Sequence, residues 1–520
     1  MGDPKDVSVR DAVREAKKVM DSVPNLYAER EELLFQDWSH TELLPKQNIT
    51  IGLPRVLFYW DTMPFWKTLL QALGFDVKMS HLSTRAIYED GLQSVASDTV
   101  CFPAKLVHGH LRDLHKQDVD RIFMPIVTTV PTENTADTSR SMCAVVKGYS
   151  LVIKNSDNPE RRWNIPFDSP LFHWFTEQDR THQLTKYFHE TFSIPAKAVE
   201  EALKQAESAQ RSFHEALQHR GAEVLAQVRK EGRYAIVLAG RPYHNDTLVN
   251  HELPSFFTDL GIPVITADSV PGVTDVTLDN SMIDIVNNFH ARMLSSAVIA
   301  AQSPHMEYVQ IVSFGCGHDA YLSDEIIRLM KEVGPKIPLV LKVDESDIRG
   351  PLGIRTRSFV ETIERRRIQE AKREQESKTT STSNAEAKLN SQAKQASEKQ
   401  SAGTSTIHEE DARKEYALDE QVAQHTGEKL ADPYPQKFDD KAGVVLVPNT
   451  SHAFSRIMSA IFSKQGLRTV SLPIGRERAI YLGKKYVHND ICFPAQIVIG
   501  EALEALESGK YDLDHVAVAT

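Results

Sequence analysis

The sequence predicts an α/β protein with two Rossmann-like subdomains, each a mainly parallel sheet with helices on both faces, plus a truncated repeat of the first subdomain after a disordered linker. Short apolar strand patterns alternate with helical patterns along most of the chain, which is typical of βαβ units. Motifs of the first subdomain recur near the C-terminal end, beyond a charged stretch of low complexity. The length of 520 residues agrees with several domains, at about one domain per 150 residues.

Five segments are expected along the chain. They are an N-terminal helical segment (1–45), a first α/β subdomain (46–195), a long helix with a second α/β subdomain (196–364), a charged low-complexity linker (365–440) and the truncated repeat unit (441–520). The linker is expected because no aromatic residue occurs between Phe359 and Tyr416, where Lys, Glu, Gln, Ser, Thr and Ala dominate. Such a segment cannot bury enough apolar surface to offset its ordering entropy, although its start is expected to be helical.

The two subdomains are read from hydrophobic patterns bounded by turn residues. In the first, the expected strands are residues 50–58, 75–79 and 121–127, and the expected helices are residues 64–73 and 102–115. In the second, a long helix over residues 196–230 precedes strands at residues 234–239, 263–266, 309–314 and 338–343. Ligands of such folds bind beyond the carboxyl ends of the strands, so the loops that follow the strands are where function is expected.

The repeat is visible as two blocks that recur in the same order. Residues 85–88 (RAIY) recur as residues 478–481, and residues 101–104 (CFPA) recur as residues 492–495. The spacing between the two blocks differs by only two residues, which chance rarely produces. The second copy reaches only its next strand pattern before the sequence ends, so we expect the repeat unit to be truncated.

Composition excludes several classes of function. The net charge of −11 argues against a nucleic-acid partner, which usually demands a concentrated basic face. No run of 18 apolar residues occurs and the N-terminus is charged, so neither a membrane span nor a secretory signal is expected. We therefore predict a soluble, cytoplasmic protein.

The four cysteines lie at positions where a thiolate would be stabilised. Cys101, Cys143 and Cys316 each come at the start of an expected helix, and Cys492 takes the place of Cys101 in the repeat. Helix N-termini carry free N–H groups and the positive end of the helix dipole, which favour negative charge and lower a thiol pKa. If the three loops share one end of the sheet, their sulfur atoms can converge.

The spacing of these cysteines bears on the metal they would hold. Structural zinc normally uses paired Cys-x-x-Cys or Cys/His elements, and the sequence contains none. Widely separated single cysteines suit an iron–sulfur cluster held by several loops, and three protein ligands would leave one iron open. The alternative interpretation is three unrelated buried thiols, which is the ordinary role of a single cysteine.

A second group of candidates lies in the turn after the strand expected at residues 234–239. Arg241, Tyr243 and His244 are ligand-binding candidates, because a cation and a phenol there can orient a carboxylate, a thioester or a cluster sulfide. The alternative is that Arg241 makes a structural ion pair and Pro242 shapes the turn.

Four motifs resemble those of one protein family. Residues 51–55 (IGLPR), 101–109 (CFPAKLVHG), 240–246 (GRPYHND) and 313–317 (SFGCG) are similar to the acyl-CoA dehydratase activase-related family. That family is itself similar to the D-component of 2-hydroxyglutaryl-CoA dehydratase and to benzoyl-CoA reductase subunits. The likeness covers about residues 25–364 and again residues 443–520.

The resemblance implies a [4Fe–4S] or related double-cubane iron–sulfur cluster. Cys101, Cys143 and Cys316 match the family's cysteine positions, and Cys492 matches the first ligand of a second unit. An ATP-dependent activase domain or protein is the implied partner, with acyl-CoA as a further ligand and a homo- or pseudo-dimer as the assembly. The chain has no phosphate-binding loop of the G-x-x-x-x-G-K-[ST] type, so we do not expect it to hydrolyse ATP alone.

Three functions remain open at this point. The first is an electron-transfer or reductase-like module of the 2-hydroxyacyl-CoA dehydratase/activase system of anaerobic metabolism. The second is a catalytic dehydratase-type subunit. The third is a non-catalytic assembly module that has lost its cluster. The sequence leaves open whether the chain is an enzyme.

Overall fold

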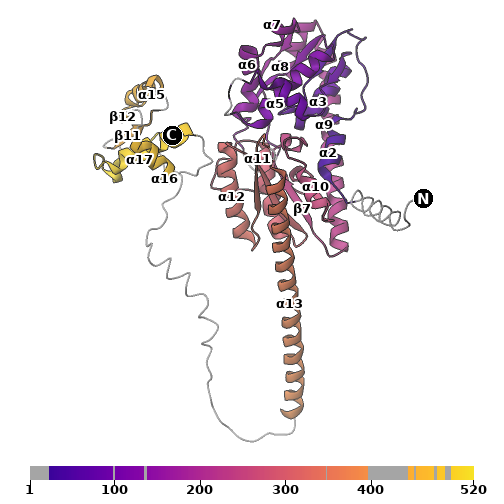
Figure 1. Cartoon of the computed structure of the whole chain (residues 1–520), viewed down its shortest axis with the longest axis vertical. Helices are drawn as coiled ribbons and strands as arrows, with labels where there is room; N and C mark the ends of the chain where they lie inside the picture. Colours follow the sequence, from indigo (N-terminus) through magenta and orange to yellow (C-terminus); the bar gives the residue numbers. More distant parts are fainter. Residues whose placement is uncertain are drawn as a thin grey trace, which may run out of the picture. The chain divides into compact units, whose positions relative to one another are not determined.

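Every strand pairing in the described sheets of the computed structural model is parallel (Figure 1). The structure describes residues 23–95, 97, 100–133, 138–346, 348–395, 443–449, 452–473, 477–486 and 493–519. The α/β class with parallel sheets and Rossmann-like subdomains is therefore confirmed.

The first subdomain is built on a sheet with the strand order β2-β1-β3-β5, beside a two-stranded sheet of β4 and β6. Its strands are β1 (Thr50–Leu53), β2 (Asp76–Met79), β3 (Arg121–Phe123), β4 (Ile126–Thr129), β5 (Phe167–Asp168) and β6 (Leu171–His173). Its helices are α3 (Tyr59–Ala72), α4 (Arg85–Leu92), α5 (Phe102–Lys116), α6 (Ala144–Ser156), α7 (Pro159–Trp163) and α8 (Glu177–Phe192).

Two strand predictions in this subdomain were too long, and prolines explain both. The strand expected at residues 50–58 ends at Leu53, because Pro54 cannot donate a ladder hydrogen bond and Leu57 turns the chain with a φ of 49°. The strand expected at residues 121–127 is divided by Pro125 into β3 and β4.

Helix α3 begins earlier than predicted and contains Pro64. A proline inside a helix leaves the carbonyl four residues earlier without its usual N–H donor. Here that carbonyl belongs to Trp60, and Nη1 of Arg30 donates to it at 2.8 Å. Arg30 lies on α2 (Leu26–Phe35), which is the described helix of the predicted N-terminal segment and ends well before residue 45.

The second subdomain has the strand order β10-β9-β7-β8. Its strands are β7 (Ala235–Ala239), β8 (Val264–Thr266), β9 (Met306–Ser313) and β10 (Leu339–Val343). Its helices are α9 (Ala196–Lys230), α10 (Leu253–Thr258), α11 (Asn288–Gln302) and α12 (Gly317–Val333), with short 3-10 turns η1 (Pro242–Asn245) and η2 (Ala267–Ser269).

Helix α9 joins the two subdomains, since it packs on α3 of the first (Figure 1) and also on η2 of the second. Its contact with η2 requires glycine at position 221, where a Cβ atom would lie 1.9 Å from the backbone oxygen of Ser269. The same junction contains a buried ion pair in which Nη1 of Arg292 lies 2.7 Å from Oδ1 of Asp61. These contacts fix the loops of the two sheets relative to each other.

Helix α13 (Arg349–Gln395) extends further into the predicted linker than the sequence indicated. Glu, Gln, Lys and Arg, which are good helix formers, are frequent in this part of the sequence. The rest of the linker, residues 396–440, lies outside the described residues and remains a prediction.

The repeat seen in the sequence is also a repeat of topology. The strand order β12-β11-β13 corresponds to β2-β1-β3. In both copies a glycine lets two helices pack closely. A Cβ atom on Gly500 of α17 would lie 1.8 Å from the backbone oxygen of Ala479 on α16. A Cβ atom on Gly109 of α5 would lie 2.0 Å from the backbone oxygen of Ile87 on α4. The elements of the repeat are β11 (Val444–Val447), α15 (His452–Lys464), β12 (Arg468–Ser471), α16 (Glu477–Tyr486), α17 (Phe493–Glu507), η3 (Leu513–His515) and β13 (Val516–Val518).

None of the described helices combines the length and the apolar character that a bilayer crossing requires.

Candidate functional site

Three of the predicted cysteines are helix N-caps. Cys101, Cys143 and Cys316 immediately precede α5, α6 and α12, with ψ angles of 149°, 136° and 110° and no side-chain capping bond. Local sequence explains the geometry at two of them, because Pro103 lies in the first turn of α5 and Gly315 turns the chain with a φ of 74°. Each thiol is therefore next to free backbone N–H groups and the positive end of a helix dipole.

The three thiols interact electrostatically. Burial raises the pKa of Cys101 to about 12, and the thiols of Cys143 and Cys316 contribute to that rise through Coulomb repulsion. Burial also raises the pKa of Cys316. The lowered thiol pKa that we expected at a helix N-terminus is therefore wrong for these two cysteines, because burial outweighs the helix dipole. All three are free thiols of intermediate exposure.

Arg241 contacts the cysteine group directly. Its Nη1 atom donates to Sγ of Cys316 at 3.1 Å and to the hydroxyl oxygen of Tyr243 at 3.1 Å. Its Nη2 atom lies 2.7 Å from Oδ1 of Asp319, which is fully buried. Burial opposes the charge of Arg241, but the Asp319 carboxylate holds its pKa well above the ordinary value. The site therefore contains one buried, permanently charged cation.

Tyr243 lies on the same side of the site. Burial raises its pKa well above the ordinary value, and the three cysteines add to this rise while Arg241 opposes it. Its hydroxyl group is therefore protonated at neutral pH and sits within electrostatic reach of all three sulfur atoms.

His244 is engaged by protein partners on both ring nitrogens. Its Nδ1 atom accepts the backbone N–H of Arg241 at 3.1 Å, so its Nε2–H donates to Oγ of Ser313 at 2.8 Å. Burial, followed by repulsion from Arg241, lowers its pKa to about 3. A neutral His244 thus shapes the turn that presents Arg241, and its predicted role in ligand binding would require one of these bonds to break.

Sequence reasoning missed a histidine pair beside Arg241. Both ring nitrogens of His290 are buried and lack a hydrogen-bond partner among the described residues. Its ring centroid lies 5.4 Å from that of His318, which follows Cys316 by two residues. A lone histidine in α11 gives no signal in the sequence, because its place beside the cysteine group depends on the packing of α11 against α12.

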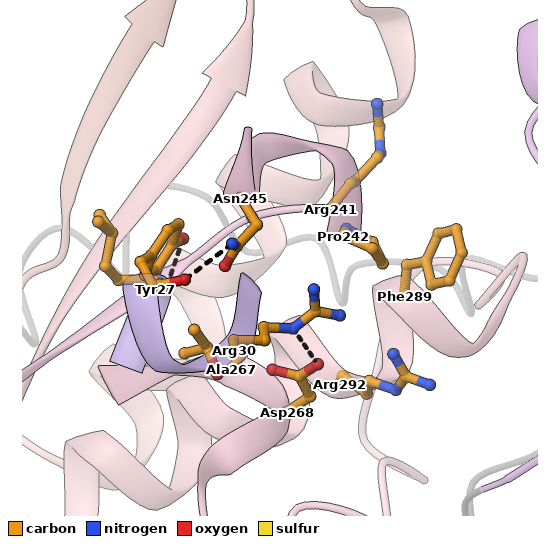
Figure 2. A pocket seen from close by; sticks show the side chains of 12 residues that line it. Tyr27, Arg30, Arg241, Pro242, Asn245, Ala267, Asp268, Phe289 and Arg292 are labelled. Atoms are coloured by element: carbon orange, nitrogen blue, oxygen red, sulfur yellow. Dashed lines mark hydrogen bonds and ion pairs between the residues drawn. The ribbon is translucent and has the colours of Figure 1, made fainter. Parts of the chain in front are cut away.

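A small cavity behind Arg241 is too small for an organic ligand. Its volume is about 20 Å³, room for about one water molecule. Figure 2 shows Arg241 extending away from the Arg30–Asp268 ion pair that lines it, in which Nε of Arg30 lies 2.9 Å from Oδ2 of Asp268. This cavity belongs to the junction between the subdomains and not to the cysteine group.

Two further findings limit the metal assignment. Within the part of the chain that the structure describes, no three His, Cys, Asp or Glu side chains are grouped closely enough to hold a single metal ion. Cys492, the fourth predicted ligand, lies outside the described residues.

Comparison with known families identifies the region that carries the site. Residues 50–270 match the family model described as CoA enzyme activase uncharacterised domain. Residues 50–270 are thus similar to a CoA enzyme activase domain. This domain includes Cys101, Cys143 and the turn with Arg241, and it ends before Cys316. It supports a role in the dehydratase/activase system, with a dehydratase component as partner. No curated protein matches the chain.

Proposed function

We propose that the CoA enzyme activase domain and the second subdomain together hold an iron–sulfur cluster through Cys101, Cys143 and Cys316, and that the protein transfers electrons within the dehydratase/activase system. The proposal rests on three N-cap cysteines that interact electrostatically, one of which, Cys316, accepts a hydrogen bond from the buried cation of Arg241. When bound, such a cluster supplies one-electron redox chemistry.

A polynuclear cluster places a different demand on the spacing of its donors than a single ion does. A single ion needs all its ligands within one coordination sphere. A cluster takes one thiolate per iron, so its thiolates stand further apart.

The surroundings of the cysteines also fit an anionic group. Each cysteine caps a helix N-terminus, and the Arg241 guanidinium contacts Cys316; both features favour a negatively charged group. The buried Nε–H of Arg241 has no partner among the described residues and is available to a sulfide or thiolate. Hydrogen bonds of this kind to sulfur are among the protein's means of setting a cluster potential.

A second candidate function, a catalytic dehydratase-type subunit, has its own observation. Three cysteine ligands leave one iron open, and the unpartnered imidazole of His290 is within electrostatic reach of Arg241 beside the site. A buried polar group without a partner costs about 1–3 kcal/mol, so a bound ligand that pairs with it would be favoured.

Iron and sulfide quantitation with EPR, on anaerobically purified full chain, tests the main proposal. We expect a brown protein containing iron and acid-labile sulfide, and a Cys316→Ala variant that has lost both. Ser323→Ala, a substitution of similar size two turns along α12, is the matched control and should keep the signal. A wild-type protein without iron, or a Cys316→Ala variant with the full signal, contradicts the proposal. Turnover of a 2-hydroxyacyl-CoA in the presence of an activase would establish the catalytic alternative.

A further inference from the structure

A buried chain of hydrogen bonds links Asp157, His108 and Tyr149 beside the cysteine group. Nδ1 of His108 lies 2.9 Å from Oδ2 of Asp157, and its Nε2 lies 3.1 Å from the hydroxyl oxygen of Tyr149. Asp157 and His108 are completely buried and Tyr149 is 3% exposed. His108 lies on α5 and Tyr149 on α6, the two helices that begin after Cys101 and Cys143.

Electrostatic interactions determine which groups donate and which accept in this series of hydrogen bonds. Burial opposes ionisation of Asp157, but the hydrogen bond from His108 and the charges of Arg162 and Arg112 lower its pKa, so it is a carboxylate. The carboxylate holds the Nδ1–H of His108, which leaves Nε2 to face Tyr149. Burial raises the pKa of Tyr149, and Cys101 and Asp157 raise it further, so its hydroxyl keeps its proton.

Tyr149 also lines a cavity of about 320 Å³. The lining residues are Ser97, Val100, Ala144, Val145, Gly148, Tyr149 and Val152. None of these residues carries a charge, and a Cβ atom on Gly148 would meet open space. The volume is at the lower end of the range typical of small-molecule sites.

The position of the cavity connects it with the cysteines. Val100 is the residue before Cys101 and Ala144 is the residue after Cys143, and both contribute to the wall. A molecule in the cavity would therefore contact the sequence neighbours of two of the three cysteines, and Tyr149 as well.

We propose that this cavity binds an aliphatic group carrying one uncharged oxygen, and that Tyr149 contacts this oxygen while His108 and Asp157 act as positioning residues that hold the Tyr149 hydroxyl group. The apolar wall favours a hydrocarbon chain, and a charged group would be buried there without a counter-ion. Binding does not depend on the proposed cluster.

His108 Nε2 and the Tyr149 hydroxyl oxygen lie within hydrogen-bonding distance. With the Nδ1–H of His108 held by the Asp157 carboxylate, Nε2 accepts the Tyr149 hydroxyl proton, and the Tyr149 oxygen keeps lone pairs that can accept a hydrogen bond from a ligand hydroxyl group.

Two probes of similar shape test the site on the full chain, before and after anaerobic loading with iron and sulfide. We expect calorimetric binding of 1-hexanol and of 1-chlorohexane, and loss of both in Gly148→Leu, which fills the cavity. Asn155→Leu, on an exposed position of the same helix, should bind both probes as the wild type does.

Tyr149→Phe separates the hydroxyl contact from packing. It should weaken 1-hexanol about three- to tenfold, the value of one hydrogen bond, and leave 1-chlorohexane unchanged. Circular dichroism melting curves of Gly148→Leu and Tyr149→Phe check that the variants fold.

Equal binding by Gly148→Leu and the wild type, or equal weakening of both probes in Tyr149→Phe, would overturn the inference. Failure here leaves the iron and sulfide content unaffected, and a wild-type protein without iron leaves probe binding unaffected. The two proposals therefore fail independently.

Discussion

Replacing Arg241 with methionine tests the electrostatics of the site, because it removes the cation but keeps a long unbranched side chain. Arg241 is 3% exposed, and its partner Asp319 is fully buried at a distance of 2.7 Å. The variant leaves a buried carboxylate without its counter-ion, which costs about 3–5 kcal/mol of unfolding free energy. Burial already raises the pKa of Asp319, so the loss should be smaller at acidic pH, where this carboxyl is protonated.

Urea unfolding followed by circular dichroism, at pH 7 and pH 5, measures the effect. Asp319→Asn and the double variant complete a double-mutant cycle, and the double variant should lose less stability than the sum of the two single variants. A loss below about 1 kcal/mol for Arg241→Met at pH 7 would refute the reasoning, because a buried, paired cation cannot be removed at so small a cost. Strictly additive losses would also refute it.

Three other predictions concern separate features. Burial raises the pKa of Asp246 from 3.8 to about 6, so its contribution to stability is present below about pH 4 and is lost as the pH rises through 6. Relative to Asp246→Asn, the wild type should lose about 3 kcal/mol of unfolding free energy between pH 4 and pH 7. A difference between the two proteins that stays constant with pH would contradict this. Gly221→Ala should destabilise the protein by about 1–3 kcal/mol in urea titrations, because its Cβ would lie 1.9 Å from a backbone oxygen, while Gly350→Ala, which meets open space, should not. In anaerobic redox titrations, Arg241→Lys should lower the midpoint potential of the proposed cluster. The reason is that the side chain of lysine cannot donate to Cys316, Tyr243 and Asp319 together. Arg211→Gln, at an exposed position, should leave the potential unchanged.

The sequence was most informative where the signals were local. The bounds of α9 agree with the expected residues 196–230, and the N-cap positions of Cys101 and Cys316 follow from Pro103 and from the glycines around Cys316. The repeated order of strands was also predictable, since two matched blocks recur with nearly the same spacing.

What the sequence did not reveal depends on contacts between distant residues. Arg241 and Cys316 are 75 positions apart, and only the pairing of β7 with β9 brings their loops together. His108 and Asp157 are 49 positions apart, so the sequence alone gives no sign that they are hydrogen-bond partners. The ends of β1 and β3 were misjudged because Pro54 and Pro125 were read within continuous apolar runs.

The central claim is that three helix-capping thiols share one inorganic centre. Iron K-edge X-ray absorption on the anaerobically purified full chain tests it most directly, because it reports both the atoms bound to iron and the presence of neighbouring irons. We predict sulfur ligation with a clear iron–iron contribution, and loss of that contribution in Cys101→Ala, Cys143→Ala and Cys316→Ala alike. Iron bound only by oxygen or nitrogen, or an iron–iron contribution that survives any one of these substitutions unchanged, would contradict the account.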